Sequence, residues 1–228
     1  MSNNICVIPA RLGSKRVPKK NIREFYGKPL IWWTINAAIK SNIFTDIIVS
    51  SDDHDVLDLA NGLNVTSFLR DDFFDDLSTS SQATIYTLDK AKIKVHQDDI
   101  IFQLLPTCPL RTCFDIKKCY DFFIKNKMLS GVSGYEMKFG NPQWLMKKNK
   151  LNKIDFVFID KQELRSQDLE IFYMLSGAVW ISKYNILFSN RSFKGKETEL
   201  IKLDWISCLD IDTEEELKIM ERLASLVY

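Results

Sequence analysis

The fold-deciding stretch of the sequence is ICVIPARLGSKRVPKKN, residues Ile5 to Asn21. It opens with the apolar run Ile5–Ile8, which is typical of a strand buried on both faces of a parallel sheet. We expect Pro9 to end that strand. Basic and turn-forming residues follow at once, so the stretch predicts a first sheet strand that runs directly into a charged loop.

The loop after this strand concentrates positive charge. Five cations lie within ten positions: Arg11, Lys15, Arg16, Lys19 and Lys20. Like charges this crowded repel one another unless an anion comes to lie among them. Gly13 lets backbone N–H groups approach a ligand, and Ser14 adds a hydroxyl donor. A solvated surface loop is the alternative, but the position directly after the first strand favours a polyphosphate site.

Two common nucleotide-binding loops are absent from the sequence. It contains neither G-x-G-x-x-G nor G-x-x-x-x-G-K-S/T, which argues against a dinucleotide-binding fold and a P-loop NTPase. The net charge of +1 argues against a general nucleic-acid or membrane surface, so the basic loop is a local feature. We expect no nucleic-acid partner.

Composition and cysteine usage indicate a cytoplasmic protein with a sizeable core. The chain has 228 residues, 46% of them hydrophobic, and no apolar run approaches the roughly 18 residues needed to cross a bilayer. We expect no signal peptide and no membrane association. The five cysteines form no C-x-x-C and are expected to be reduced structural thiols. With only two histidines, a His-based metal site or catalytic triad is not expected.

Strand-like and helix-like segments alternate along the chain. Further strands are expected at 46–51, 65–69, 100–105, 131–136, 177–181 and 200–206. Helices are expected at 30–40, up to about 62, and at 82–94, 115–125 and 214–226, the last with Thr213 as N-cap. This pattern predicts an α/β, Rossmann-like fold: a mostly parallel sheet with helices on both faces, in one nucleotidyltransferase domain spanning 1–228. Ligands of such sheets bind over the carboxyl ends of the strands.

The pattern is interrupted between residues 139 and 173. A polar, basic run at 147–153 is followed by Phe156–Ile159, which could pair as a hairpin arm or an edge strand. We predict an excursion from the main sheet that carries a dimer contact and part of the sugar site. A flexible surface insertion is the alternative.

Several stretches together resemble the acylneuraminate cytidylyltransferase family, which activates sialic acids and related nine-carbon keto sugars as CMP esters. The matching segments occur in the family's order: IPARLGSKRVPKKN (8–21), GKPLIWWTINAA (27–38), IIVSSDD (47–53), PTCPLR (106–111), RSQDLEIFYMLSGAVWIS (165–182) and LDIDTEEEL (209–217). They reach over nearly the whole chain. The resemblance implies that the sugar's anomeric hydroxyl attacks the α-phosphate of CTP in line and that pyrophosphate leaves. It also implies a homodimer with a role in cell-surface polysaccharide biosynthesis.

The resemblance assigns roles to individual residues. Catalysis is expected of Arg11, Lys20, Asp210 and Asp212, and nucleotide binding of Arg11, Gly13, Ser14, Lys15, Lys20, Asn21, Arg70 and Ser81. Sugar binding is expected of Gln103, Leu105, Arg165 and Gln167, where a guanidinium could pair with the sugar carboxylate. Asp210 and Asp212 would share one Mg²⁺ or Mn²⁺, because a hard cation needs carboxylates. The alternative for these acids is a helix cap plus a solvated carboxylate. Asp52 is a weaker nucleotide or metal candidate.

Some residues depart from the family pattern, and they leave alternatives open. Leu105 stands where sialic-acid members have a glutamine that contacts the sugar, and Gln103 lies two residues earlier on the same strand face. Arg16 and the sequence RSQDL at 165–169 favour pseudaminic or legionaminic acid over N-acetylneuraminic acid as the substrate. A cytidylyltransferase for the eight-carbon sugar Kdo, a metal-dependent glycosyltransferase using a preformed sugar nucleotide, and a silent homologue are the alternative functions.

Overall fold

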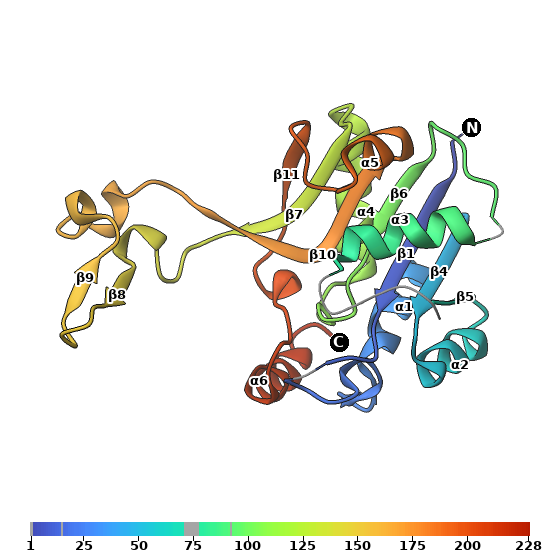
Figure 1. The fold of residues 1–228 in the computed structure, drawn as a ribbon, viewed down its shortest axis with the longest axis horizontal. Coiled ribbons are helices and arrows are strands. Elements are labelled where there is room, and N and C mark those ends of the chain that lie inside the picture. The colour runs from blue at the N-terminus through green and yellow to red at the C-terminus, as the bar shows by residue number, and fades with distance from the viewer. Residues whose placement is uncertain (1, 15, 71–77, 92) are drawn as a thin grey trace.

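The molecule is built around a seven-stranded sheet with the order β11-β7-β10-β6-β1-β4-β5 (Figure 1). The computed structural model describes residues 2–14, 16–70, 78–91 and 93–228. The strands are β1 (Asn4–Ala10), β4 (Asp46–Ser51), β5 (Thr66–Leu69), β6 (Ile100–Gln103), β7 (Ser130–Glu136), β10 (Tyr173–Lys183) and β11 (Thr198–Lys202). The pairings make six of them parallel, and β10 alone runs antiparallel to its neighbours β6 and β7. The predicted Rossmann-like, mostly parallel sheet is confirmed.

Strand β1 lies in the middle of the sheet, and its exit differs from the expected one. It continues through Pro9 to Ala10, whereas the sequence predicted that Pro9 would stop it. The strand tolerates a proline here because β6 pairs with β1 only as far as Val7. Beyond that point β1 has a partner on one side only, so the missing N–H costs no ladder bond on the other side.

Helices cover both faces of the sheet, as expected. One face carries α1 (Leu30–Ser41), α2 (His54–Gly62) and α4 (Cys113–Lys125), whose apolar sides join one core cluster with the sheet. The other face carries α3 (Ser80–Lys90) and α5 (Tyr184–Asn190), which contribute Ile85, Leu88 and Leu187 to a second cluster. Across the described ranges, no helix is both long and apolar enough to span a membrane.

A third core cluster lies beyond the carboxyl end of β1. The short hairpin β2 (Glu24–Phe25) and β3 (Lys28–Pro29) and the start of α1 pack there against α6 (Glu214–Ala224). Phe25, Trp33 and Ile211 are buried in this cluster. It therefore brings the segment after the basic loop, near residue 25, against the segment near residue 211.

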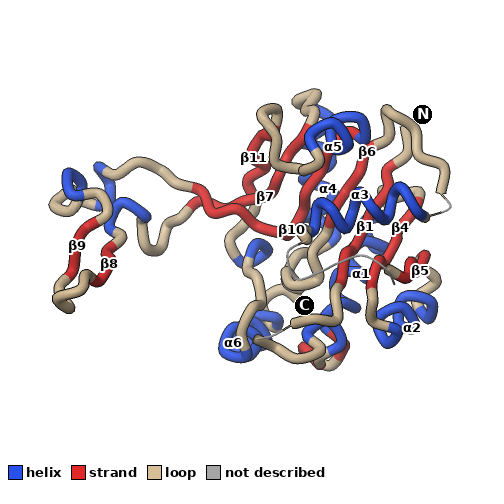
Figure 2. Tube along the Cα trace, in the orientation of Figure 1, coloured by secondary structure: helices blue, strands red, loops and turns tan. Residues whose placement is uncertain are grey.

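An arm projects from the sheet between β7 and β10, as Figures 1 and 2 show. It contains the two-stranded hairpin β8 (Met146–Lys148) and β9 (Ile154–Phe156) and three 3₁₀ turns, η2 (Pro142–Trp144), η3 (Ile159–Lys161) and η4 (Ser166–Asp168). The predicted excursion is present, but its strands lie earlier than expected, since 157–159 is not part of the hairpin. Within one chain the arm packs against little else (Figure 1).

Other differences in the elements are local. The last strand ends at Lys202, not at 206, and the chain then forms a 3₁₀ turn, η5 (Ile206–Cys208). The N-caps of α3 and α6 are Thr79 and Thr213, each in a capping box, so the predicted cap of the final helix is confirmed.

Candidate functional site

The basic loop is fastened to the scaffold by its backbone. The Leu12 N–H donates to Asp52 Oδ1 at 2.8 Å, and the Asn21 side-chain amide donates to the Arg11 carbonyl at 2.9 Å. Asp52, at the exit of β4, therefore holds the loop in place, and its part in binding a nucleotide or a metal stays a prediction. Arg11 and Gly13 are exposed, and Ser14 is half-buried. Lys15, also predicted to bind the nucleotide, lies outside the described residues.

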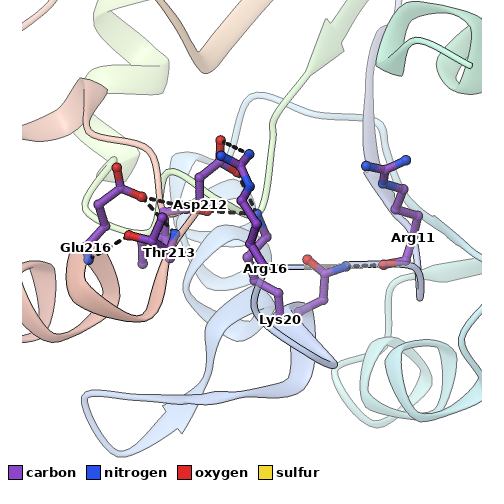
Figure 3. Close-up of polar contacts among 8 residues, drawn as sticks. Arg11, Arg16, Lys20, Asp212, Thr213 and Glu216 are labelled. Carbon is purple, nitrogen blue, oxygen red and sulfur yellow. Dashed lines mark hydrogen bonds and ion pairs between the residues drawn. The ribbon is translucent and has the colours of Figure 1, made fainter. Parts of the chain in front are cut away.

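The acidic pair lies across from this loop, immediately after η5. Ile211 is buried between the two carboxylates, which leaves Asp210 and Asp212 facing solvent. Lys20 reaches over from the loop: its Nζ lies 3.0 Å from Asp212 Oδ1 and 2.8 Å from the Ile211 carbonyl. Arg16 Nη2 lies 2.6 Å from Asp212 Oδ2. Two cations from the amino end thus hold one carboxylate from the carboxyl end (Figure 3).

The two carboxyl groups differ in their electrostatic surroundings. Partial burial raises the pKa of the Asp210 carboxyl. A hydrogen bond from Thr107 acts in the opposite direction, and the negative charge of Asp212 raises the pKa further. Partial loss of solvent also acts to raise the pKa of Asp212, but the bonds from Lys20 and Arg16 outweigh it, so that pKa is lowered. Both groups reach solvent, so screening reduces these effects. The site is a narrow zone of mixed charge, not a purely basic one.

The backbone of the acidic pair is fixed by two groups that sequence reasoning missed. Glu216 Oε2 accepts from the N–H groups of Asp212 and Thr213, each at 2.8 Å. The Ile211 N–H donates to the Thr107 carbonyl at 2.9 Å. Glu216 carries a sequence signal in the capping-box spacing Thr-x-x-Glu. The Thr107 contact uses a backbone carbonyl, which leaves no trace in residue type.

The acidic pair can supply part, but not all, of a cation site. Among the described residues no group of three His, Cys, Asp or Glu side chains is placed to hold a metal ion. Two adjacent oxygen donors suit Mg²⁺, which binds proteins through one or two carboxylates and completes its shell with phosphates and water. The residues therefore fit a cation that arrives with a phosphate ligand.

Arg70 and Ser81 are both buried. Arg70 is 7% exposed and donates from Nη2 to the Ala10 carbonyl at 2.7 Å, at the exit of β1. Burial lowers its pKa, while the nearby Asp52 acts in the opposite direction. Ser81 is 3% exposed, and its Oγ accepts a long bond of 3.5 Å from the Phe193 N–H. Arg70 is thus tied to the exit of β1, where the loop begins, whereas Ser81 is tied to the segment between α5 and β11.

Gln103 is the last residue of β6, and Leu105 lies beyond the end of that strand, so the strand expected over 100–105 is shorter than predicted. Gln103 is fully buried: Thr84 donates to its Oε1 at 2.8 Å, and its Nε2 donates to Ser80 Oγ at 3.1 Å. Leu105 is half-buried, and its side chain rests on Gly177 of β10, where a Cβ would lie 2.3 Å from Leu105 Cδ1. Of these two sugar-site candidates, only Leu105 has a side chain that reaches solvent.

Arg165 and Gln167 are not brought to the loop within one chain. Both lie at η4 in the arm, and both are exposed. Arg165 pairs with Asp168, its Nε lying 2.8 Å from Asp168 Oδ2. The arm carries them away from the basic loop and the acidic pair (Figure 1). Arg11, by contrast, is part of the loop but lies apart from the Arg16–Lys20–Asp212 group (Figure 3).

Comparison with known proteins identifies the family of the chain. A family model described as Cytidylyltransferase matches residues 5–225, which include both the loop and the acidic pair. The chain belongs to the cytidylyltransferase family. It is therefore a nucleotidyltransferase, and the resemblance inferred from the sequence is confirmed.

The names of relatives of this cytidylyltransferase mention different sugar acids. It is 32% identical over 226 residues to "Pseudaminic acid cytidylyltransferase" of Campylobacter jejuni, covering 96% of this chain and 95% of the relative. It is 34% identical to "CMP-N,N'-diacetyllegionaminic acid synthase" of Legionella pneumophila, with coverage of 97% and 96%. It is also 34% identical to "N-acylneuraminate cytidylyltransferase" of Streptococcus agalactiae, covering 93% of this chain and 51% of that protein.

Solved structures support the fold of this cytidylyltransferase. A CMP:2-keto-3-deoxy-manno-octonic acid synthetase complexed with CTP superposes with a TM-score of 0.70 at 16% identity, covering 99% of both chains. A 4-diphosphocytidyl-2C-methyl-D-erythritol synthase from Anaerococcus prevotii gives 0.68 at 12% identity, covering 98% of this chain and 99% of that one. At these identities the likeness establishes the fold alone.

Proposed function

We propose that this cytidylyltransferase activates a nine-carbon keto sugar acid, a nonulosonic acid, to its CMP ester. The anomeric oxygen of the sugar bonds to the α-phosphorus of CTP and loses its proton, and the bond from that phosphorus to the pyrophosphate oxygen breaks. The substrates named in its relatives support this class of sugar. Transfer of this kind depends on positioning and charge neutralisation more than on covalent chemistry by the protein.

The observation that carries the proposal is the bridge made by Lys20. The Lys20 side chain is 13% exposed, and its ammonium group joins the basic loop to Asp212 and to the Ile211 carbonyl. A triphosphate on the loop would therefore lie next to the acidic pair. Arg11, Lys20 and the loop N–H groups would bind the phosphates, and Asn21 would hold the loop backbone in shape.

We also propose that Asp210 and Asp212 hold Mg²⁺ or Mn²⁺. Such an ion supplies charge neutralisation at the phosphate oxygens when bound. Both oxygens of Asp212 are engaged by Arg16 and Lys20 in the free chain, so a bare cation would meet two positive charges. A cation bound to CTP brings a compensating negative charge, and the phosphates give Arg16 and Lys20 new partners. We therefore expect metal to enter as its CTP complex.

The arm supports a homodimer as the working form. Large apolar side chains are exposed along it: Phe139 at 79%, Leu151 at 77%, Ile159 at 74% and Ile171 at 65%. Exposed apolar surface of this kind marks a protein interface. A second copy is the favoured occupant, because Arg165 and Gln167 are remote from their own chain's loop and can serve a sugar site only across an interface.

The test is direct. The protein is incubated with CTP, Mg²⁺ and a panel of N-acetylneuraminic, legionaminic, pseudaminic and eight-carbon Kdo acids, and products are identified by mass. A CMP ester of at least one nine-carbon acid, with equimolar pyrophosphate, is expected. Product with Kdo alone would reject the nine-carbon class. CTP left unconsumed, with turnover of a preformed sugar nucleotide instead, would favour the glycosyltransferase alternative.

We also propose that the protein acts in the cytoplasm. All five cysteines are free thiols, which supports a reducing compartment such as the cytoplasm. The product is a sugar nucleotide, and a glycosyltransferase acting in polysaccharide biosynthesis is the class of enzyme that would consume it.

A further inference from the structure

Strand β10 is irregular at the point where it contacts η5. Its pairing with β7 shifts register between Leu175 and Trp180. A bulge of this kind takes backbone groups out of the ladder, so they need other partners. Ser176, 3% exposed, supplies two of them: the Ala178 N–H donates to Ser176 Oγ at 3.1 Å, and the Trp180 indole N–H donates to the Ser176 carbonyl at 2.6 Å. The bulge therefore holds Ser176 in one place.

The hydroxyl proton of Ser176 is directed out of the bulge. Ser176 Oγ donates to the Cys208 carbonyl at 2.8 Å, and Cys208 is the last residue of η5. A serine hydroxyl has a single proton, so the bond from Ala178 uses only its acceptor side. Cys108 Sγ also lies 3.8 Å from this oxygen, and a thiol is a weak partner. The one proton of this buried hydroxyl is thus given to the segment that leads into the acidic pair.

This bond fixes the chain just before the acidic pair. Cys208 comes two residues ahead of Asp210 in the sequence. On the other side of Asp210, the Ile211 N–H donates to the Thr107 carbonyl at 2.9 Å. The backbone of Asp210 is therefore held from both sides, by the bulge of β10 and by the turn at 106–111. Groups behind metal ligands act in this way to set the direction of the ligand.

We infer that Ser176 is a positioning residue for Asp210 and acts through the Cys208 carbonyl. The inference deepens the proposed function and rests on it, because Asp210 needs a set direction only if it holds a cation together with the triphosphate. Without the Ser176 bond, the chain on the η5 side of Asp210 has more freedom, and the carboxylate spends less of its time aimed at the cation.

A structural cap is the alternative role for this hydroxyl. The last carbonyls of a helical turn need partners, and Ser176 provides one. The turn η5 is also held to α4, where Ser207 Oγ donates to Asp115 Oδ2 at 3.0 Å, so loss of the Ser176 bond does not detach it. A cap would contribute to stability alone. A positioning residue would also affect how cation-bound CTP is held.

The test removes one serine hydroxyl at a time from β10. Ser176→Ala removes the bond to Cys208. Ser182→Ala is the matched control, because Ser182 is 0% exposed, lies near the other end of the same strand, and donates from Oγ to the Lys183 carbonyl at 3.1 Å. Dissociation constants are measured for CTP with Mn²⁺ and for CTP in EDTA, alongside the melting temperature.

We expect Ser176→Ala to weaken binding of Mn²⁺·CTP by about 10-fold, the low end of losses seen when a group behind a metal ligand is removed. Binding of CTP in EDTA should be unchanged, because the basic loop keeps its contacts. Both serine variants should melt at a lower temperature than the unmodified protein, since each loses a buried hydrogen bond. Ser182→Ala should bind both forms of CTP normally, which separates a role toward the cation from a role in folding.

Three results would overturn the inference, and they differ. If the unmodified protein binds CTP no more tightly with Mn²⁺ than in EDTA, the proposed metal site is wrong and the role of Ser176 falls with it. If Mn²⁺ tightens binding but Ser176→Ala matches Ser182→Ala, the metal site stands and only the positioning role is wrong. If Ser176→Ala weakens both forms of CTP equally, Ser176 supports the fold of the whole site.

A second variant covers a failure to fold. Should Ser176→Ala not fold, Ser176→Cys keeps a side chain at the position with a weaker donor and is read in the same way. The proposed function is decided separately, by whether the unmodified protein forms a CMP ester with any acid of the panel.

Discussion

At the scale of single residues, Lys20 and Arg16 contact the same carboxylate but with different degrees of burial. The Lys20 side chain is 13% exposed and bonds to two acceptors, whereas the Arg16 side chain is 64% exposed and bonds to one. Exposed ion pairs contribute little, while charged hydrogen bonds shielded from water contribute more. Lys20 should therefore matter more for binding the triphosphate.

We expect Lys20→Met to lower kcat/KM for CTP by about 100-fold and Arg16→Gln by less than about 10-fold. A charged hydrogen bond contributes about 1.5–3 kcal/mol, and each 1.4 kcal/mol is a tenfold change in rate. Initial rates of pyrophosphate release at varied CTP measure both. Equal losses in the two variants would show that the difference in burial does not determine how much each cation contributes to kcat/KM.

The contact of Leu105 with Gly177 offers a second test at this scale. A Cβ on Gly177 would lie 2.3 Å from Leu105 Cδ1, so Gly177→Ala must displace the leucine side chain. We expect a loss of about 1–3 kcal/mol in the free energy of unfolding, typical of overpacking, and a higher KM for the sugar with an unchanged KM for CTP.

Gly62→Ala is the control for that variant. Nothing lies within 4 Å of its added Cβ, and Gly62 ends helix α2. Both kinetic constants and the stability should stay near those of the unmodified protein. If the sugar KM of Gly177→Ala is unchanged while Leu105 is displaced, Leu105 does not line the sugar site.

At the scale of elements, the arm is the segment whose surface a single chain leaves uncovered. Replacing Leu151 and Ile159 together by Asp puts two charges where a dimer would bury apolar groups. We expect the double variant to be a monomer by light scattering after gel filtration, with the melting behaviour of a folded domain. Its KM for the sugar should rise if Arg165 and Gln167 act across the interface.

Phe114→Asp serves as the control for the arm variant. Phe114 is 76% exposed on α4, outside the arm, so this change adds a charge at an equally exposed apolar site. It should leave the oligomeric state unchanged. A double arm variant that stays dimeric, or a monomeric unmodified protein, would place the interface elsewhere or remove it.

The sequence predicted these elements well where residue type dictates them. Apolar runs such as Ile5–Ile8 place strands, and Thr213 with Glu216 three residues later predicts the start of the last helix. The direction of β10 could not be read, because an apolar run such as 177–181 is equally compatible with parallel and antiparallel pairing. Helix α5 was missed, since Tyr184–Asn190 is seven residues long with Leu187 its one buried residue.

The candidate site was predictable to a similar extent. The cations stood out by charge and spacing, the resemblance to the family implied the Asp210–Asp212 pair, and the structure brings Lys20 to Asp212. Gln103 had the predicted strand face, but the hydroxyls of Ser80 and Thr84 on α3 engage its amide. Those contacts depend on how helix and strand pack, which spacing along one strand does not reveal.

At the scale of the whole molecule, buried thiols in the core make the free energy of unfolding depend on pH. Cys6, Cys108 and Cys119 are 0% exposed and Cys208 is 3% exposed. Burial raises the pKa of all four, to about 12 for Cys108 and about 11 for Cys208. Free cysteine titrates near 8.5, so in alkaline solution the unfolded chain loses these protons first.

The direction of the pH dependence of stability follows from the unfolded chain losing its thiol protons before the folded chain does. A pKa raised by folding gives stability that is fully present below the unfolded pKa and is lost as pH rises above it. Between pH 8.0 and 9.5 we expect the free energy of unfolding, from urea titrations in reducing buffer, to fall by about 1 kcal/mol for each buried thiol.

Cys119→Ala should lose one thiol's share of that pH dependence, whatever its effect on stability at pH 8.0. Cys113→Ala, at a half-buried position on α4, is the matched change. If Cys119→Ala and the unmodified protein showed the same pH dependence, the Cys119 thiol would already ionise in the native core, and the packing described around it would be wrong.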